Sequence, residues 1–213
     1  MKKATKAEIQ IIKEAFVEKY QDAVTELTYT NDYELLIAII LSAQCTDKRV
    51  NIITPALFEK YPSVFELVDA SLDDVKDLLK SCSFFNNKAK NIIKMAHSVI
   101  EDFEGEIPHV QKQLMTLAGV GNKTANVFMI ESEGANLMAV DTHVFRVSHR
   151  LGLSDGKNVT ETEKHLVKRL KDDLHIFHQA MVLFGRYTCK AIKPDCDNCL
   201  FPQVCKTKET FHV

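Results

Sequence analysis

The sequence predicts an all-α protein with about nine to eleven short helices. Apolar residues recur at helical spacing nearly everywhere, and the first such stripe consists of Ile9, Ile12, Phe16 and Tyr20. Val and Ile fall within these patterns rather than in alternating runs, so no pair of strands is expected. Several helix starts are marked by a Ser, Thr or Asp with an acidic residue shortly after it.

The first two helices follow from their apolar patterns. The stripe at 9–20 predicts one helix, and 33–43 predicts a second with Asp32 as its N-cap. Because the second helix is apolar almost all round, we expect it at the centre of the core.

The next helices are marked by their ends. A capping box at 63–66 opens one helix, and 71–74 opens the following helix in similar fashion. A longer helix then ends before Gly105, which is expected at its C′ position. Its apolar face consists of Ile92, Ile93, Ala96, Val99, Ile100 and Phe103.

The second half of the chain continues the helical pattern. A helix at about 110–117 runs into a glycine-containing turn and out into another helix. Asp141 is expected to cap a helix that ends at Gly152. A second capping box lies at 160–163, and a last helix covers 175–187.

Composition narrows the class of protein. The 213 residues, 46% apolar and 26% charged, suit one large domain or two small ones that share a cleft. The net charge of −2 excludes a globally basic DNA-coating protein but permits a local basic patch. The longest apolar run, 35–41, is far short of the roughly 20 residues a membrane span needs. The start of the chain is amphipathic and charged rather than a signal peptide, so a cytoplasmic protein is expected.

The C-terminal cysteines predict a metal centre. Cys189, Cys196, Cys199 and Cys205 lie within 17 positions, separated by six, two and five residues. Four thiolates so close together suit either zinc or a 4Fe-4S cluster. Zinc ribbons usually have two CxxC knuckles and only one is present here. The remaining interpretation is that the four cysteines are buried thiols that bind no metal, but the segment is too polar to lie wholly in a hydrophobic core.

The loop at 190–195 and the other two cysteines have separate interpretations. Lys190 and Lys193 precede Pro194 and are candidates to contact phosphates, although a solvated face explains them too. Cys45 and Cys82 lie outside the C-terminal group and are interpreted as packed thiols.

The turn at 117–125, LAGVGNKTA, is a candidate phosphate site. Gly119 and Gly121 allow positive φ and close approach of another backbone. The amides at the start of the following helix would hold a phosphate, although a plain tight turn between helices is an equal alternative.

Lys123 and Asp141 are candidate catalytic groups. Lys123 falls in the first turn after the glycines, at the edge of apolar surface, where desolvation and the helix dipole would favour a neutral, nucleophilic amine. Asp141, held ionised by the helix amides, could stabilise a cation or take a proton from Lys123. The alternatives are that Lys123 is an ordinary surface residue and that Asp141 only caps its helix.

Together these motifs resemble the endonuclease III family of base-excision DNA glycosylases. LAGVGNKTA resembles that family's helix-hairpin-helix, and VDTHVFRV at 140–147 resembles the block with its catalytic aspartate. The cysteine spacing matches its iron–sulfur loop, and LSAQ at 41–44 with Thr46 and Asp47 resembles a further block. The resemblance covers roughly residues 25–206 in order.

The resemblance implies a bifunctional DNA glycosylase and abasic-site lyase that removes oxidised pyrimidines. Lys123 would be the nucleophile, Asp141 the catalytic carboxylate, and the four cysteines the ligands of a 4Fe-4S cluster. Gln44 and Phe84 match the positions that fill the gap left by a flipped base. The backbone of 119–121, which includes Val120, would hold a phosphate. The expected partner is damaged double-stranded DNA, with no membrane and no obligate protein partner, and the protein is expected to be a monomer.

The same resemblance implies a two-lobed fold with its active site in the cleft. One lobe, 25–135, would be a six-helix bundle that includes the helix-hairpin-helix at about 110–130. The other, 1–24 and 136–213, would hold the cluster in the loop 189–205. We expect the cluster to be structural rather than a reactant.

Some positions depart from the family pattern. Ala118 replaces the usual Pro, Asn122 replaces a frequent Arg, and 83–85 reads Ser-Phe-Phe where Gly-Leu-Tyr is common. These departures affect the expected lesion preference more than the chemistry. His143, beside Asp141, is interpreted as a packing residue.

Three rival functions remain. A monofunctional adenine glycosylase of the same superfamily would lack the lysine that stands here at Lys123. The second is a non-catalytic iron–sulfur protein that binds DNA or carries electrons, which would not explain why both Lys123 and Asp141 are present. A zinc protein that only binds nucleic acid is the third.

Overall fold

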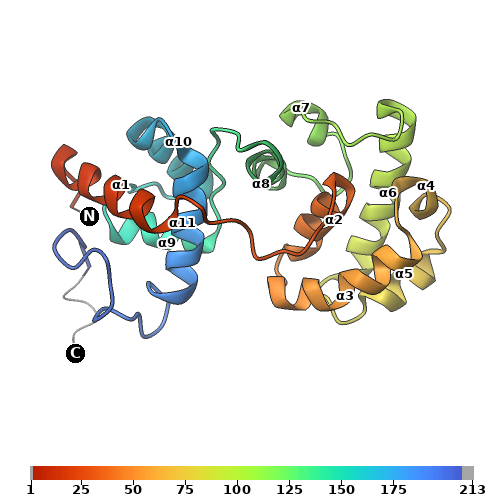
Figure 1. Ribbon diagram of the computed structural model, residues 1–213, viewed down its shortest axis with the longest axis horizontal. Helices are drawn as coiled ribbons and strands as arrows, with labels where there is room; N and C mark the ends of the chain where they lie inside the picture. The colour runs from red at the N-terminus through yellow and green to blue at the C-terminus, as the bar shows by residue number, and fades with distance from the viewer. Residues whose placement is uncertain (1, 208–213) are drawn as a thin grey trace. The chain divides into compact units, whose positions relative to one another are not determined.

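The computed structural model describes residues 2–207, and this part of the chain contains helices but no strands (Figure 1). The all-α prediction and its expected helix count are confirmed, because eleven helices are present in the described residues. They are α1 (Lys6–Tyr20), α2 (Asp32–Ser42), α3 (Asp47–Lys60), α4 (Val64–Leu67), α5 (Leu72–Leu79), α6 (Phe85–Phe103), α7 (Gln111–Leu114), α8 (Asn122–Glu133), α9 (Thr142–Arg150), α10 (Val159–Leu170) and α11 (Leu174–Tyr187).

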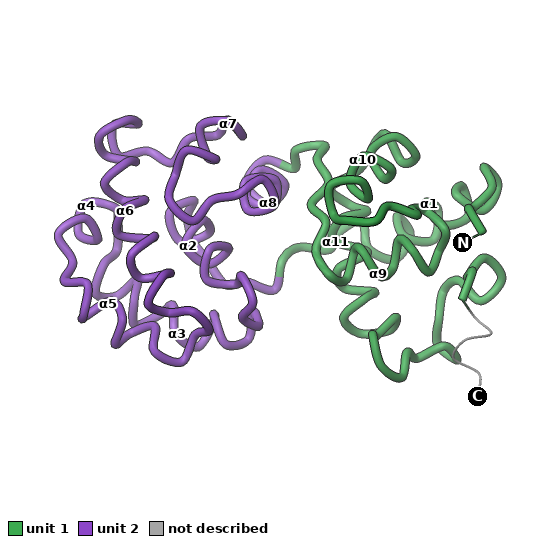
Figure 2. The backbone as a smooth tube through the Cα atoms, turned by 180° about the vertical axis from the view of Figure 1, so that it is seen from behind, with its two compact units in different colours: residues 1–25, 134–213 green, residues 26–133 purple. Residues whose placement is uncertain are grey.

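The chain folds into two compact units (Figure 2). Unit 1 joins the N-terminal segment 1–25, with α1, to the C-terminal segment 134–213, with α9, α10 and α11. Unit 2 is the continuous segment 26–133 and contains α2 to α8. The chain therefore passes between the units twice, and each unit has its own hydrophobic core.

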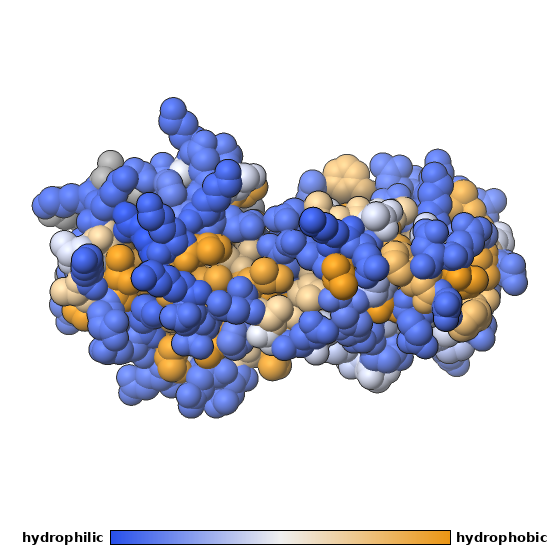
Figure 3. Space-filling view, turned by 90° about the horizontal axis from the view of Figure 1, so that it is seen from above, coloured by the Kyte–Doolittle hydropathy of each residue, from blue (hydrophilic) through white to orange (hydrophobic). Residues whose placement is uncertain are grey.

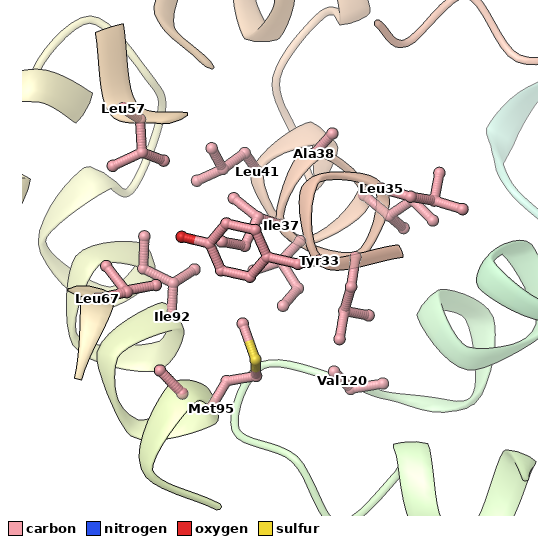
Figure 4. Packing of buried hydrophobic residues seen from close by; sticks show 14 of the residues in the cluster. Tyr33, Leu35, Ile37, Ala38, Leu41, Leu57, Leu67, Ile92, Met95 and Val120 are labelled. Atoms are coloured by element: carbon pink, nitrogen blue, oxygen red, sulfur yellow. The ribbon is translucent and has the colours of Figure 1, made fainter. Parts of the chain in front are cut away.

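Unit 2 is built around α2, as the sequence predicts. Eight consecutive or nearly consecutive side chains of α2 are buried, from Tyr33 to Leu41. Figure 4 shows five of them among residues of other elements, including Leu57 of α3, Met95 of α6 and Val120 of the turn before α8. Burying all faces of one helix makes α2 the element against which the rest of unit 2 packs.

Unit 1 is held together by α11, which packs against both α9 and α1. Three fully buried or nearly buried rings meet edge to face at this junction: Phe16 of α1, Phe184 of α11 and Phe201 of the C-terminal loop. Their ring centroids lie 4.8–5.7 Å apart, within the favourable range for aromatic pairs. Phe201 thereby attaches the cysteine-containing loop to the core.

Two predicted helix caps are wrong by one or two residues. Asn31, not Asp32, caps α2, because its extended backbone lets the side chain accept from the Glu34 N–H at 3.0 Å. Likewise Asn158 caps α10 by accepting from the Glu161 N–H at 2.9 Å, so the capping box expected at 160–163 does not start the helix. In both cases the predicted cap already lies inside the first helical turn.

The other predicted ends differ in detail. Ser63 caps α4 as expected, whereas Ser71 precedes α5 without a side-chain cap bond. Gly105, with φ of +89°, follows the end of α6 and donates its N–H to the Val99 carbonyl, as a C′ glycine does. The helix expected at 110–117 is a single turn, α7, because the residues after Leu114 form tight i to i+3 bonds instead.

The surface of the described residues is mostly hydrophilic in the view of Figure 3, with small, scattered hydrophobic patches. Large exposed apolar side chains are spread over many elements, including Phe65, Phe84, Tyr187 and Ile192. No helix among residues 2–207 is long and apolar enough to cross a membrane.

Candidate active site and metal centre

The hairpin that contains the glycines consists of α7, a turn and α8. Gly119 has φ of +85°, and a Cβ there would lie 3.2 Å from the Asn91 side chain and 3.4 Å from Ile40. Glycine is therefore required at this position both for its backbone conformation and for its close packing. The matching expectation for Gly121 is wrong: its φ is not positive and a Cβ would meet open space.

Side chains on both helices brace this hairpin. The Val120 side chain is 6% exposed and packs in the core. The Val120 N–H donates to the Leu117 carbonyl at 3.1 Å and so stabilises the turn in the free protein. Gln111 donates its amide to the side-chain oxygens of Asn122, at 3.3 Å, and of the buried Asn126. Asn122, where the family often has Arg, thus joins the two helices of the hairpin.

Lys123 lies in the first turn of α8, where helix N–H groups lack intrahelical partners and carry positive partial charge. The Ala125 N–H bonds to the Gly121 carbonyl at 2.9 Å, which places the start of the helix at the glycine. The Lys123 side chain is exposed, so the expectation that burial desolvates its amine is wrong for this structure. Its position at a helix N-terminus is as predicted.

Asp141 is the N-cap of α9, as the sequence predicts. Its Oδ1 accepts from the Val144 N–H at 2.7 Å, which fixes the carboxylate at the start of the helix. Asp141 is half-buried and belongs to unit 1, whereas Lys123 belongs to unit 2. His143 packs against Gly185 of α11 and contacts the Arg146 guanidinium, which agrees with its interpretation as a packing residue.

Two arginines connect α9 to the cysteine loop, and the sequence analysis assigned no role to either. Arg146 donates to the carbonyls of Cys189, at 2.9 Å, and of Gly185, at 2.7 Å. Arg150, one turn later, donates to the Lys190 carbonyl at 2.7 Å and to the Cys189 sulfur at 3.3 Å. Two arginines four residues apart lie on the same face of a helix, so their spacing in the sequence could have indicated a shared partner.

The four C-terminal cysteines line one hollow in unit 1, together with Arg150, Thr188 and Pro194. Burial raises the pKa of the Cys199 thiol, and the nearby thiols of Cys189, Cys205 and Cys196 raise that pKa further. All four cysteines are free. Within residues 2–207, no group of three or more His, Cys, Asp or Glu side chains is arranged as a site for a single metal ion.

A backbone N–H and a guanidinium donate to two of these sulfurs. The Phe201 N–H donates to the Cys199 sulfur at 3.3 Å, as Arg150 does to Cys189. Donors of this kind stabilise thiolates, which are the form that binds iron or zinc. Lys190 and Lys193 are exposed on the loop between the first two cysteines, and Lys193 has φ of +50°.

Gln44 and Phe84 lie in unit 2 and share an unusual backbone. Gln44 has φ of +54° and Phe84 has φ of +57°, a left-handed region that non-glycine residues rarely adopt. Both side chains are exposed, Phe84 to 62%. Neither side chain therefore belongs to the buried core of unit 2. Cys82 is buried and Cys45 is half-buried against the same core, which agrees with packed thiols.

Comparisons with known proteins identify the family. A family model described as HhH-GPD superfamily base excision DNA repair protein matches residues 37–172, more than half of the chain. The chain is 44% identical to endonuclease III of Haemophilus influenzae over 87% of this chain and 88% of the relative. It is 39% identical to endonuclease III of Escherichia coli K12 over 89% of this chain and 90% of the relative.

The chain belongs to the endonuclease III family of the HhH-GPD superfamily. Solved structures agree with this assignment. A trapped covalent intermediate of endonuclease III with DNA matches with a TM-score of 0.92 and 41% identity, over 97% of this chain and 98% of that one. A non-covalent endonuclease III–DNA complex matches equally well. A thermostable thymine-DNA glycosylase, at 21% identity and a TM-score of 0.84, shares the fold.

Proposed function

We propose that this endonuclease III family member is a base-excision DNA repair enzyme that removes oxidised pyrimidines and cleaves the strand at the resulting abasic site. The observation that carries the proposal is Lys123 in the first turn after the hairpin, in a chain whose 41%-identical structural relative was trapped in a covalent intermediate with DNA. A trapped covalent complex requires a nucleophile on the protein, and Lys123 matches the family motif at that position.

The chemistry assigned to Lys123 and Asp141 accounts for both steps. The Lys123 amine forms a bond to C1′ of the sugar as the bond between C1′ and the base breaks, and the base leaves with the electron pair of that bond and takes up a proton from water. Asp141 stabilises the cationic sugar and accepts the proton that the amine loses. The sugar ring then opens, and C1′ becomes part of an imine with Lys123. Loss of a proton from C2′ next expels the 3′ phosphate by β-elimination. Finally, water hydrolyses the imine and releases the lysine.

The proposed DNA contacts fall on several elements. First-turn amides of α8, beside Gly119 and Gly121, are assigned to a backbone phosphate, since a helix N-terminus binds anions. The exposed Gln44 and Phe84 are assigned to the gap that a flipped base leaves in the duplex. We further propose that residues 25–135 form one lobe and residues 1–24 with 136–213 the other, and that Lys123 and Asp141 act on the same sugar.

The four cysteines fit a 4Fe-4S cluster, which we propose as the cofactor. They line one hollow, and Arg150 and the Phe201 N–H donate to two of the sulfurs. When bound, such a cluster supplies four covalent cross-links and a potential redox centre. The contacts of this chain favour a structural role, because Arg146 and Arg150 connect the cysteine loop to α9, the helix that Asp141 caps.

Replacing Cys199 with Ser is expected to remove the cluster and destabilise unit 1. The purified parent protein should be brown with broad absorption near ~400 nm, as expected for thiolate-ligated iron, and the variant should lose that absorption. The matched control is Cys45→Ser, which changes a cysteine of unit 2 and should leave iron content unchanged. A colourless parent that contains zinc would contradict the cofactor assignment.

DNA binding is expected to weaken steeply with salt, despite the net charge of −2, because phosphate contacts dominate such affinities. The double variant Lys190→Ala/Lys193→Ala should lower the magnitude of the salt slope by about 2, since each lost phosphate contact removes about one counterion. The control is Lys164→Ala/Lys168→Ala, which removes two exposed lysines of α10 in the same unit. Equal slopes in the two double variants would show that Lys190 and Lys193 do not contact phosphates.

The proposed function is tested with a duplex that carries one thymine glycol. The parent should cut the damaged strand on the 3′ side and leave an undamaged duplex intact. Base loss that becomes strand cleavage only after alkali would instead indicate a monofunctional glycosylase, tested further with an adenine mispair. Binding without base loss on a panel of lesions would leave the non-catalytic function.

We propose that the protein acts as a monomer on damaged double-stranded DNA in the cytoplasm, where it associates with the nucleoid. The named relatives come from bacteria, whose DNA lies in that compartment. The six free cysteines are those of a protein kept in a reducing environment.

A further inference from the structure

Lys88 is a buried lysine of unit 2 for which the sequence pattern indicates no role. It lies in α6, is 6% exposed, and its Nζ has three partners. It donates to the Leu41 carbonyl at 2.7 Å and the Ala43 carbonyl at 2.6 Å, and it lies 3.2 Å from the Cys82 sulfur. A lysine is rarely buried unless it is paired, and here its donors are used by groups on two different chain segments.

The first segment is the C-terminal end of α2. The carbonyls of the last helical turn lack intrahelical partners and carry partial negative charge, so they favour a cation. Leu41 lies in that turn and Ala43 is the C-cap. Lys88 therefore satisfies the end of α2 at the point where the chain turns into the residues before α3 (Figure 1).

The second segment is the turn between α5 and α6. Cys82 lies in this turn, and its thiol contacts the Leu41 carbonyl at 3.5 Å. The Lys88 backbone N–H also donates to the Phe84 carbonyl at 3.1 Å, which fixes the start of α6. Lys88 thus contacts this turn with both its side chain and its main chain.

The partners of Lys88 lie next to Gln44 and Phe84, the two exposed residues whose backbone is in the left-handed region. Ala43 directly precedes Gln44, and Cys82 precedes Phe84 by two residues. A non-glycine residue with positive φ persists only where its surroundings hold the backbone firmly. The Lys88 side chain bonds to the Ala43 carbonyl beside Gln44 and contacts the Cys82 sulfur, and its backbone N–H bonds to the Phe84 carbonyl.

We propose that Lys88 is a positioning residue that holds the Gln44 and Phe84 loops at a fixed separation, so that both side chains enter the duplex together as the damaged nucleotide leaves it. The inference rests on the proposed function and adds to it the device that sets the geometry of gap filling. Lys88 contacts neither DNA nor the reacting atoms, and it acts through the two loops.

The test uses Lys88→Met, which keeps the length of the side chain and removes its donors. Single-turnover excision of thymine glycol from a duplex is expected to fall by about 10- to 100-fold, because misplaced positioning groups cost this much. Cleavage of an abasic site in single-stranded DNA should be little changed, since a single strand has no gap to fill. A 2-aminopurine placed opposite the lesion should also unstack more slowly or less completely than with the parent.

Two further variants separate positioning from general stability. Tyr33→Phe removes another buried side-chain bond of unit 2, from the Tyr33 hydroxyl to the Tyr61 carbonyl at 2.8 Å, and serves as the control for lost stability. Lys88→Arg keeps the charge, but a planar guanidinium cannot reproduce the same convergent contacts. We expect Lys88→Arg to melt cooperatively and to show a smaller loss on the duplex substrate alone.

The results distinguish the possibilities. A loss confined to duplex excision, absent in Tyr33→Phe, supports the positioning role. Equal losses on both substrates, or parental excision by Lys88→Met, would overturn it. If Lys88→Met does not fold, parental duplex excision by Lys88→Arg overturns the proposal and selective loss supports it. Absence of excision by the parent itself would contradict the proposed function, and the 2-aminopurine signal would then decide the positioning role alone.

Discussion

Replacing Lys123 with Ala is expected to lower strand cleavage at thymine glycol by about 10³-fold or more, since removal of a nucleophile eliminates the covalent route. Lys123 lies in the first turn of α8 with an exposed side chain, so the substitution removes no buried contact and should leave the melting temperature near that of the parent. Single-turnover kinetics on a duplex with one lesion measures the effect.

Lys123→Arg separates nucleophilicity from charge. Arginine keeps a positive charge at the helix N-terminus but remains protonated and cannot attack the sugar. We expect DNA affinity close to that of the parent and cleavage as low as that of Lys123→Ala. If Lys123→Arg retains cleavage within tenfold of the parent, the lysine contributes only charge, and the nucleophile must be another group.

Asp141→Asn is expected to lower base excision by about 10²- to 10⁴-fold, the usual range for loss of an acid–base group. The substitution suits this position because Asn is as good an N-cap as Asp, so the bond from the Val144 N–H should persist. Activity should therefore fall without a matching fall in stability.

The control for Asp141→Asn is the reverse change at another cap of the same unit. Asn158 caps α10 in the same way, by accepting from the Glu161 N–H, so Asn158→Asp exchanges the same two residues away from the proposed chemistry. Both variants should melt close to the parent, and only Asp141→Asn should lose activity. Parental excision by Asp141→Asn would mean that this carboxylate is a helix cap and nothing more.

The parts of the fold that depend on local pattern could be predicted from the sequence. The burial of α2 on all faces follows from an uninterrupted apolar run, and Asp141 caps α9 as its sequence indicates. Where two adjacent residues can both cap a helix, the choice between them depends on backbone conformation. Asn31 rather than Asp32 has the extended φ and ψ that an N-cap needs, and no sequence pattern shows this.

The parts of the site that depend on long-range contacts were not predictable. Arg150 contacts groups about 40 positions away along the chain, and Lys88 contacts carbonyls more than 40 positions before it. A single sequence gives no measure of such proximity. The left-handed backbone of Gln44 and Phe84 was also unforeseen, because both residues usually avoid it and only the surrounding contacts stabilise it.

Borohydride trapping tests most directly whether Lys123 forms an imine with the damaged sugar. Borohydride reduces an imine to a stable amine, so a duplex with one thymine glycol should become covalently attached to the parent protein. Mass spectrometry of the digested complex should locate the attached sugar on Lys123, and Lys123→Ala should give no adduct. An adduct on a different residue, or none with a parent that still removes the base, would contradict the account.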